Sequence, residues 1–541
     1  MKKVLTYLTA TAALLALLVP ATAAQAAQTT DAPTTDAITN LLSEYSDYWK
    51  AGEGVQQGDE AEKVLQHNDA LTEEINNKAA TETADKTNDQ QARAVLDAQM
   101  SSEATLHDAL GPILGAYYEN GINGGKLPLT KAFLSAMNAT ASTGTAKNYY
   151  SYPRPYIDRP NYLGESLNMG ELKSTLNIQQ VQAYVDQGQY VGLAASGSFP
   201  SGHTTFAFTQ GAGLATILPE FGTQIMTRVS EAGNNRIVLG VHYPLDIMGG
   251  HIAGQYGVAT ALSDPTVASQ AAAARTELVN YLTDECAADN YGSTLSACIG
   301  KTGATSTNEY SNSFTDDVVS APVNSPSSAV AAYTARMSYG FQSEASQKAS
   351  VQVPSAAINL LRNVPAYKGL NDTQLKQILA MTENTRVYPL ESSAQGWGQI
   401  NLAAAYSAKV TLSADGTVQS VAAGQSAASV VRQQTNDSDG NQGGSGTNDG
   451  SGTSNAKGGT SNSTSGTSSK TASNAKKSTT TAKKPQPIAS VSGQGVVDAS
   501  GKNASLAKTG SDVGLVVSIA AMLAVAGSAV SLTVMRMKRG H

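Results

Sequence analysis

The chain has 541 residues, of which 41% are hydrophobic and 15% are charged, and its formal net charge at pH 7 is −7. A mildly acidic chain without a strongly basic face is a poor partner for nucleic acid, so we exclude nucleic-acid binding as its main role. A site for a small anion must therefore come from a few lysines and arginines gathered in one place.

The first 26 residues carry the features of an export signal in their usual order. Lys2 and Lys3 precede an apolar run at positions 8–19, and the alanine-rich segment Ala21–Ala26 follows. The apolar run is shorter than the roughly 20 residues that span a bilayer, so a membrane helix is the weaker interpretation. We predict a signal peptide over residues 1–26 that is cleaved after Ala26.

Between residues 27 and 300 the apolar residues recur mainly at the spacing of an α-helix, which predicts an all-α helical bundle. Helices are expected near residues 38–49, 60–77, 88–118, 130–142, 178–187, 204–218, 221–237, 245–262 and 267–282. None of them is apolar on every side over a bilayer-spanning length, so the bundle is expected to lie outside the membrane. The two cysteines of the chain, Cys286 and Cys298, predict one disulfide closing a short loop, as is common in exported proteins.

The first polar cluster is the segment from Lys147 to Pro155. Lys147 and Arg154 supply fixed positive charge, and an arginine can hold a tetrahedral anion through two parallel N–H groups. Pro153 and Pro155 restrict the backbone on both sides of Arg154, which lowers the entropy lost when the arginine is held in place. Taken alone, a lysine and an arginine at this spacing are more often two surface cations.

The second cluster is Ser201-Gly202-His203, at the start of a predicted helix. The first backbone N–H groups of a helix are unpaired and favour an anion, and Gly202 allows close approach because it has no Cβ. The Ser201 hydroxyl can donate to phosphate or cap the helix. A plain serine cap explains Ser201 and Gly202, but it gives no reason for the histidine beside them.

The third cluster is Arg236, His242 and Asp246, in which the histidine and the aspartate are four residues apart. If residues 242–246 are helical, the two side chains share a face. The carboxylate can then hold one imidazole nitrogen while the other is free to attack phosphorus. Pro244 fits the first turn of that helix. An ordinary surface pair of histidine and aspartate is the alternative interpretation.

The three clusters in this order resemble the signature of the type 2 phosphatidic acid phosphatase superfamily, which includes bacterial class A acid phosphatases and vanadium haloperoxidases. The signature is KxxxxxxRP, then PSGH, then SRxxxxxHxxxD. The chain matches the first two parts completely, and in the third part Asn235 stands where the family has serine. The resemblance covers residues 147–246 and implies a helical bundle that hydrolyses phosphate monoesters as an acid phosphatase.

The resemblance also implies a role for each matched residue. His242 would be the nucleophile, oriented by Asp246, and would form a phosphohistidine intermediate, while His203 would be the general acid. The phosphate would be bound by Lys147, Arg154, Ser201, Gly202, Asn235 and Arg236. An amide N–H of Asn235 can replace the usual serine hydroxyl. Since three cations supply the charge stabilisation that a metal would otherwise provide, no cofactor is expected.

Residues 301–430 form an extension that can either wrap the bundle or fold as a separate module. Short helices are expected at 353–363 and 372–381, and a strand at 409–418. Residues 431–505 are mainly Ser, Thr, Gly, Asn and Lys, which predicts a disordered spacer. The predicted order is therefore a signal at 1–26, a phosphatase domain at 27–300, the extension, the spacer and a final segment at 506–541.

The final segment has the composition of a sorting signal. The pentapeptide Leu506–Gly510 precedes an apolar stretch at 513–534 and a basic tail, and the stretch is long enough to span a membrane. This order resembles the wall-sorting signal of Gram-positive bacteria. The resemblance implies cleavage by sortase between Thr509 and Gly510 and covalent attachment of the protein to the peptidoglycan of the cell wall. Before sorting, the C-terminal segment is expected to be inserted in the membrane.

Two other functions are compatible with the sequence. A vanadium-dependent haloperoxidase uses the same anion-binding residues for vanadate, with the residue that matches His242 as the ligand of the metal. A non-catalytic surface adhesin would share the spacer and the anchor, but the complete set His203, His242 and Asp246 favours an enzyme. A lipid phosphatase of the same superfamily would place the motifs on transmembrane helices, which are not predicted in the bundle.

Overall fold

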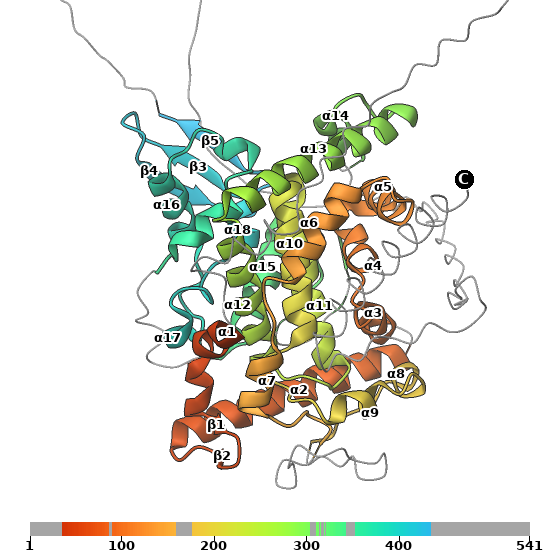
Figure 1. Cartoon of the computed structure of the whole chain (residues 1–541), viewed down its shortest axis with the longest axis vertical. Coiled ribbons are helices and arrows are strands. Elements are labelled where there is room, and N and C mark those ends of the chain that lie inside the picture. Colours follow the sequence, from red (N-terminus) through yellow and green to blue (C-terminus); the bar gives the residue numbers. More distant parts are fainter. Residues whose placement is uncertain are drawn as a thin grey trace, which may run out of the picture. The chain divides into compact units, whose positions relative to one another are not determined.

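The fold is described by a computed structural model over residues 35–85, 89–157, 176–302, 310–312, 314, 319, 321–341 and 352–433. The predicted signal peptide, nearly all of the spacer and the sorting segment lie outside these residues. Figure 1 shows that the described part is mainly helical. None of the helices described there is long and apolar enough to span a membrane.

The bundle consists of helices of very different lengths. The helices that precede the first polar cluster are α1 (Thr35–Leu41), α2 (Asp59–Ala84), α3 (Gln90–Asp97), α4 (Ser102–Leu106), α5 (Gly111–Asn123) and α6 (Pro128–Asn138). The helices that carry or flank the clusters are α7 (Gly144–Tyr150), α8 (Gln182–Asp186), α9 (Gln189–Ala194), α10 (Gly202–Ile217), α11 (Gly222–Val238) and α12 (Pro244–Ala261). They are followed by α13 (Pro265–Ala288) and α14 (Leu295–Thr302). The remaining elements are the 3-10 helices η1 (Ser43–Asp47), η2 (His107–Leu110) and η5 (Pro219–Phe221) and the antiparallel strands β1 (Trp49–Lys50) and β2 (Gly54–Val55).

Helix α10 is the central helix of the bundle and packs against α6, α11, α12 and α13 (Figure 1). Small residues let these helices approach closely. A Cβ on Gly211 would lie 2.4 Å from Val229 Cγ1 of α11, and one on Gly254 would lie 2.5 Å from Phe208 Cβ of α10. Helices α10, α11 and α12 are buried along nearly their whole length. Their ends, which carry the second and third polar clusters, are therefore held in a closely packed core.

Helix α11 is fully buried although it carries several charged residues. Arg228 donates to both carboxylate oxygens of Asp97 and to Asp108. Arg93 forms an ion pair with Glu231, which also lies 3.6 Å from Arg228. Burial raises the pKa of Glu231, but the positive charges of Arg93 and Arg228 have the larger combined effect and lower this pKa to about 2. Each of these buried charges thus has a partner of opposite sign, which offsets the cost of removing it from water.

Most helices predicted from periodicity are confirmed, but three stretches differ. The predicted helix at 88–118 is divided into α3, α4, η2 and α5, because Met100 and Gly111 adopt positive φ angles of 53° and 76°. The stretch at 38–49 contains α1 and η1 and ends in strand β1. In the extension, the α-helix expected at 353–363 is the 3-10 helix η7 (Ser355–Leu360).

The extension packs against the bundle instead of forming a separate module. Its other elements are α15 (Pro326–Ser338), η8 (Pro365–Tyr367), α16 (Asp372–Thr382), α17 (Glu391–Ala394), α18 (Leu402–Tyr406), β3 (Lys409–Leu412), β4 (Val418–Ala422) and β5 (Ser429–Arg432). Helices α15 and α18 both contact α11, and the Tyr333 hydroxyl of α15 lies 3.0 Å from His251 Nε2 of α12. Most buried apolar residues of the extension belong to the same hydrophobic core as those of the bundle.

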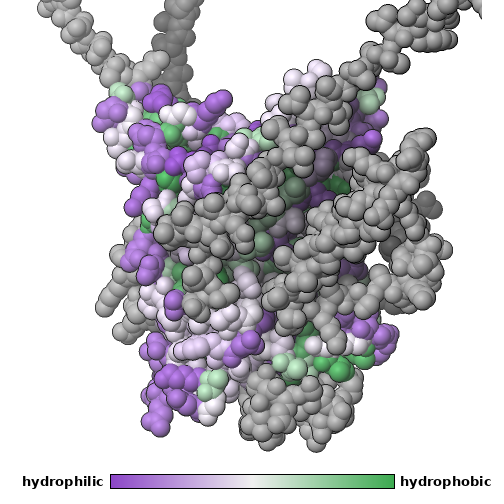
Figure 2. Space-filling model, in the orientation of Figure 1, coloured by the Kyte–Doolittle hydropathy of each residue, from purple (hydrophilic) through white to green (hydrophobic). Residues whose placement is uncertain are grey.

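The all-α prediction needs correction at two places, the hairpin of β1 and β2 and a three-stranded sheet in the extension. In that sheet β3 lies between β4, which is antiparallel to it, and β5, which is parallel to it. The strand expected at 409–418 is β3 followed by a turn, in which the Ser413 N–H donates to the Thr417 carbonyl at 2.9 Å. Figure 2 shows mainly hydrophilic and neutral residues on one face of the described part, with a hydrophobic patch near α8 and α9.

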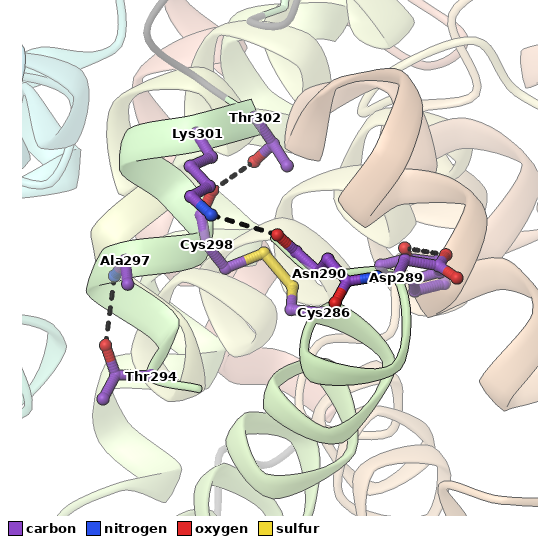
Figure 3. Close-up of a disulfide and its surroundings, with 9 residues drawn as sticks. Cys286, Asp289, Asn290, Thr294, Ala297, Cys298, Lys301 and Thr302 are labelled. Carbon is purple, nitrogen blue, oxygen red and sulfur yellow. Dashed lines mark hydrogen bonds between the residues drawn. A yellow bond between two sulfur atoms is a disulfide. The ribbon is translucent and has the colours of Figure 1, made fainter. Parts of the chain in front are cut away.

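The predicted disulfide between Cys286 and Cys298 is present and joins the end of α13 to α14 (Figure 3). The two Cα atoms are 5.9 Å apart, and the cysteines are separated by 12 positions in the chain. The Lys301 ammonium group of α14 donates to the backbone carbonyl of Asn290 in the loop between the two helices at 3.0 Å (Figure 3). Both cysteines are fully buried, whereas residues 289–294 between the two helices are exposed or half-buried, so the bridge anchors a surface loop at its two ends.

Candidate active site

The loop that leads into α10 links the three polar clusters. Lys147, in the last turn of α7, donates from Nζ to the carbonyls of Gly197 and Ser198 at 2.8 and 3.1 Å. Further along the loop, the Ser201 N–H donates to the Asp246 carbonyl at 3.0 Å. These bonds bring the segments that carry the three clusters together.

Arg154 is 2% exposed, and its guanidinium is held by backbone carbonyls of α9 and of neighbouring loops. Nε donates to Leu193 and Ser196 at 2.9 and 3.1 Å, and Nη1 donates to Val241 at 2.9 Å. Nη1 also lies 3.2 Å from His242 Nε2. Burial lowers the pKa of Arg154, but an arginine keeps its proton at physiological and acidic pH. The guanidinium therefore brings a positive charge directly to the histidine.

His242 lies in the loop before α12, and its tautomer follows from its two partners. Nδ1 lies 2.9 Å from Asp246 Oδ2, while Nε2 faces the Arg154 guanidinium, which can only donate. The proton is therefore on Nδ1, and Nε2 keeps its lone pair. Such an imidazole is oriented through one nitrogen and can act as a nucleophile through the other.

Residues 242–246 are not helical throughout, which was the condition for placing His242 and Asp246 on one helix face, but the expected contact between them forms. Helix α12 begins at Pro244, as expected for a proline in the first turn, so His242 precedes the helix. Asp246 is in the first turn, and its Oδ2 also accepts the N–H of Tyr243 at 2.9 Å. The pairing therefore depends on a carboxylate at a helix start, where unpaired N–H groups stabilise it, and not on two residues that share a helix face.

Arg236, near the end of α11, is fully buried. Its Nη2 donates to the Tyr184 hydroxyl at 3.1 Å, and its guanidinium carbon lies 5.6 Å from the centre of the Tyr184 ring. Its Nε and Nη1 are buried and have no hydrogen-bond partner within the described part of the chain. Because buried N–H groups of a cation are costly to leave unpaired, these two donors are available to the oxygens of a bound anion.

Ser201 caps α10, which is one of the two roles that the sequence allows. Its Oγ accepts the N–H of Thr204 at 3.2 Å, and the helix begins at Gly202. A Cβ on Gly202 would lie 3.2 Å from Thr143 Oγ1 and 3.7 Å from Lys147 Cε. The missing side chain therefore keeps this helix start, with its unpaired N–H groups, close to the lysine.

His203 follows at the second position of α10 and is partly buried. Its Nε2 lies 3.3 Å from the carbonyl of Ala98, in the turn between α3 and α4. Burial, and then the charges of Arg236 and Arg154, lower the pKa of His203 well below its ordinary value of 6.5. Burial followed by the charge of Arg154 also lowers the pKa of His242. Both imidazoles are therefore neutral at neutral pH, and both lie within reach of the same cations.

Asn235 is held by side chains from outside the three clusters. Its amide donates to Asp97 Oδ2 at 2.8 Å, and its carbonyl oxygen accepts from Gln90 Nε2 at 3.2 Å. Asp97 is in turn paired with Arg228. One amide hydrogen of Asn235 is thus committed to Asp97, and the expectation that this amide donates to phosphate stays a prediction.

Sequence reasoning does not identify three residues of the site, Ser198, Tyr184 and Asp97. Ser198 is fully buried and donates to the carboxylate of Asp246. Its position three residues before Ser201, next to the second motif, is the one local signal that could have singled it out. Tyr184 on α8 and Asp97 at the end of α3 come from other parts of the chain, and no spacing rule connects them with the motifs.

The arrangement as a whole suits the transfer of a phosphoryl group. Three cations and a helix start surround an imidazole whose Nε2 carries no proton, so developing negative charge can be stabilised while the Nε2 lone pair attacks. In the part of the chain that the structure describes, no group of three or more His, Cys, Asp or Glu side chains could hold a metal ion. The expectation that no cofactor is needed is not tested by this observation and stays a prediction.

Comparison with known proteins supports the superfamily prediction for this part of the chain. Residues 128–266, which contain the three clusters, match a family model described as PAP2 superfamily. An acid phosphatase of Zymomonas mobilis is 28% identical over 135 residues, which are 25% of this chain and 43% of that protein. A non-specific acid phosphatase of Providencia stuartii is 34% identical over 85 residues, covering 16% and 34% of the two chains. A non-specific acid phosphatase of Salmonella typhimurium is 26% identical over 189 residues, which are 34% of this chain and 65% of that protein. The chain thus spans less than two thirds of the length of each of these relatives.

Proposed function

We propose that this protein is an exported acid phosphatase, anchored to the bacterial cell wall, that hydrolyses phosphate monoesters through a phosphohistidine on His242. One observation carries the proposal. His242 is held through Nδ1 by Asp246, and its unprotonated Nε2 faces the Arg154 guanidinium. An imidazole in this state among buried cations suits attack on the phosphorus of a bound ester. The similarity to acid phosphatases over the same part of the chain supports this choice of reaction.

In the first step, the Nε2 lone pair of His242 attacks phosphorus, and the bond between phosphorus and the ester oxygen breaks. The three cations offset the negative charge on the remaining phosphate oxygens. His203 gives its proton to the departing alkoxide, which leaves as an alcohol. Asp246 balances the positive charge that the imidazole ring gains when Nε2 is phosphorylated.

In the second step, a water molecule attacks the phosphorus, and the bond between phosphorus and Nε2 breaks. Neutral His203 takes a proton from this water, and inorganic phosphate leaves. His242 returns to its neutral state with its proton on Nδ1. One ester and one water molecule have then become one alcohol and one phosphate.

The charges of the site favour activity at acidic pH. His203 must carry a proton in the first step, but burial and the neighbouring arginines lower its pKa. A bound phosphate dianion raises this pKa again, and a low pH acts in the same direction. His242 must be unprotonated at Nε2, and burial and the charges of Arg154 and Lys147 lower its pKa. The proposed reaction requires a pH at which His203 is protonated in the complex while Nε2 of His242 is not, and an acidic optimum is the expected result.

The location at the cell wall rests on the two ends of the chain. The signal at residues 1–26 and the sorting segment at 506–541 support export followed by attachment through Thr509. The disulfide between Cys286 and Cys298 suits an oxidising compartment. In a Gram-positive host, Thr509→Ala is expected to move the protein from the wall fraction to the membrane and the medium. An unchanged amount in the wall fraction would contradict attachment by sortase.

Hydrolysis of p-nitrophenyl phosphate by the purified protein tests the proposed reaction. His242→Ala should lower kcat by about 1000-fold or more, because the nucleophile is lost, while the circular dichroism spectrum stays unchanged. His107→Ala is a matched control, since it removes an imidazole from η2, and it should keep full activity. Mass spectrometry of the wild type quenched during turnover should show one phosphoryl group on the peptide that contains His242.

Three outcomes would contradict the proposal. An active His242→Ala variant would refute the site assignment. Loss of activity on addition of a chelator alone would refute the expectation of a metal-independent reaction. Oxidation of halide by peroxide with added vanadate, in the absence of ester hydrolysis, would favour the haloperoxidase.

A further inference from the structure

A serine hydroxyl meets the same carboxylate oxygen that orients the proposed nucleophile. Ser198 Oγ donates to Asp246 Oδ2, which also lies 2.9 Å from His242 Nδ1 and 2.9 Å from the Tyr243 N–H that it accepts. Ser198 Oγ is itself 3.5 Å from His242 Nδ1. The other carboxylate oxygen, Oδ1, is buried and has no hydrogen-bond partner among the described residues. Three donors thus meet on one oxygen, and the hydroxyl is the one that comes from another segment.

The backbone of Ser198 connects this carboxylate with the first polar cluster. Its N–H donates to the Tyr152 carbonyl at 2.7 Å, and its carbonyl accepts from Lys147 Nζ at 3.1 Å. Ser198 and Tyr152 are both fully buried. Because both backbone groups are bonded in a packed environment, the side chain has little freedom to turn away from Asp246.

We propose that Ser198 is a positioning residue, which holds the Asp246 carboxylate in place and through it fixes the Nδ1–H tautomer of His242. This inference rests on the proposed function, since it assigns Ser198 a task within the phosphatase reaction. Without the hydroxyl, the carboxylate keeps two donors, both from its own segment, and can rotate toward its unpaired oxygen. The imidazole then loses the fixed partner that directs Nε2 toward phosphorus.

The groups around Asp246 set the direction of the expected pH effect. Burial raises the pKa of Asp246, while the hydrogen bonds from Ser198 and the Tyr243 N–H and the charges of Lys147 and Arg154 lower it. Removing the hydroxyl therefore raises this pKa further. Asp246 holds the imidazole only as an anion. In the variant without the hydroxyl, Asp246 therefore becomes protonated, and activity is lost, at a higher pH than in the wild type. The acid limb of the kcat profile should move to higher pH.

Two other titratable groups face the pair from the packed helices, Arg236 of α11 and His203 of α10. Both lower the pKa of His242. Neither has a hydrogen bond to the Ser198 hydroxyl, so its removal leaves their contributions in place. The change in the pH profile can therefore be assigned to the carboxylate.

The experiment measures kcat, KM and the pH profile of the full exported chain with p-nitrophenyl phosphate. Ser198→Ala should lower kcat about 10- to 100-fold, as expected for the loss of a hydrogen bond to a charged group. KM should change less than about threefold, because the cations that bind phosphate remain. Ser198→Thr keeps the hydroxyl and should restore most of the activity. Ser407→Ala is the matched control, a serine that is 1% exposed and donates to the Ala403 carbonyl in the extension.

A double-mutant cycle with Asp246→Asn separates positioning from a general structural effect. If Ser198 acts through the carboxylate, Ser198→Ala should change kcat less than about threefold in the Asp246→Asn background. An undiminished loss in that background would overturn the proposal, as would an unchanged kcat and pH profile in the single variant. A wild type that does not hydrolyse the ester would refute the proposed function itself. If Ser198→Ala does not fold, Ser198→Cys, which keeps the size and weakens the donor, is judged by the same criteria.

Discussion

Replacing Asp246 by asparagine probes the candidate site most directly, because the change removes a charge and keeps the shape of the side chain. His242 Nδ1 and Asp246 Oδ2 are 2.9 Å apart, and the two side chains are 1% and 0% exposed. Phosphorylation makes the imidazole ring positive, so the variant loses the attraction between two buried charges. A hydrogen bond to a charged group contributes about 2 kcal/mol. The Coulomb energy of two charges at about 4 Å is about 4 kcal/mol at an effective dielectric constant of about 20.

These two energies bracket the expected effect of Asp246→Asn. We expect kcat to fall about 30- to 1000-fold, since about 1.4 kcal/mol corresponds to a factor of about ten in rate. The assay is the initial rate of p-nitrophenyl phosphate hydrolysis at acidic pH, with circular dichroism to verify the fold. Asp372→Asn removes an exposed carboxylate paired with Arg362 and should leave kcat unchanged. A kcat of Asp246→Asn within about threefold of the wild type would refute the reasoning.

Arg236→Lys should raise the inhibition constant of inorganic phosphate about tenfold or more, because a lysine ammonium does not replace the two donors, Nε and Nη1, that have no partner in the described part of the chain. Unchanged inhibition would show that these donors do not hold phosphate. Burial, followed by the charge of Glu44, raises the pKa of Glu391 from 4.5 to about 8. Between these two pH values the folded state keeps a proton that the unfolded state releases. The free energy of unfolding therefore falls as the pH rises from the lower value to the higher one. Glu391→Gln should therefore stabilise the protein at alkaline pH, on the order of 3 kcal/mol, and hardly at all below the lower value. Thermal unfolding of both proteins at alkaline pH and at a pH below the lower pKa measures this difference. An equal change in Tm at the two pH values would contradict the raised pKa of Glu391.

Much of the site can be predicted from the sequence because its motifs depend on local patterns. Apolar periodicity locates α10, α11 and α12 to within a few residues, and Pro244 marks the start of α12. The helix cap is also a local feature, because Ser201 accepts the N–H of Thr204, which is only three positions further along the chain. Periodicity fails at Met100, where a residue that is not glycine adopts a positive φ in the turn between α3 and α4. No feature of that side chain indicates the turn.

Contacts between distant segments could not be predicted in this way. The Ser198 hydroxyl meets Asp246 across 48 positions, and the Asn235 amide meets Asp97 across 138. The second contact commits one amide hydrogen of Asn235 to Asp97, so the expectation that Asn235 replaces the serine of the family depends on the other amide hydrogen. Neither pairing leaves a trace in residue spacing, since the intervening chain folds back through several helices.

Residue type and spacing by themselves determined which side chains are candidates for holding an anion and attacking phosphorus, because this chemistry depends on groups that only a few residues carry. Only the tertiary structure decided that Arg154 faces Nε2 of His242 and that two buried donors of Arg236 have no partner among the described residues. It also decided that the extension shares the core of the bundle. The physical reason is that hydrogen bonding and burial depend on distances in space, and helix periodicity specifies these only between neighbours along the chain.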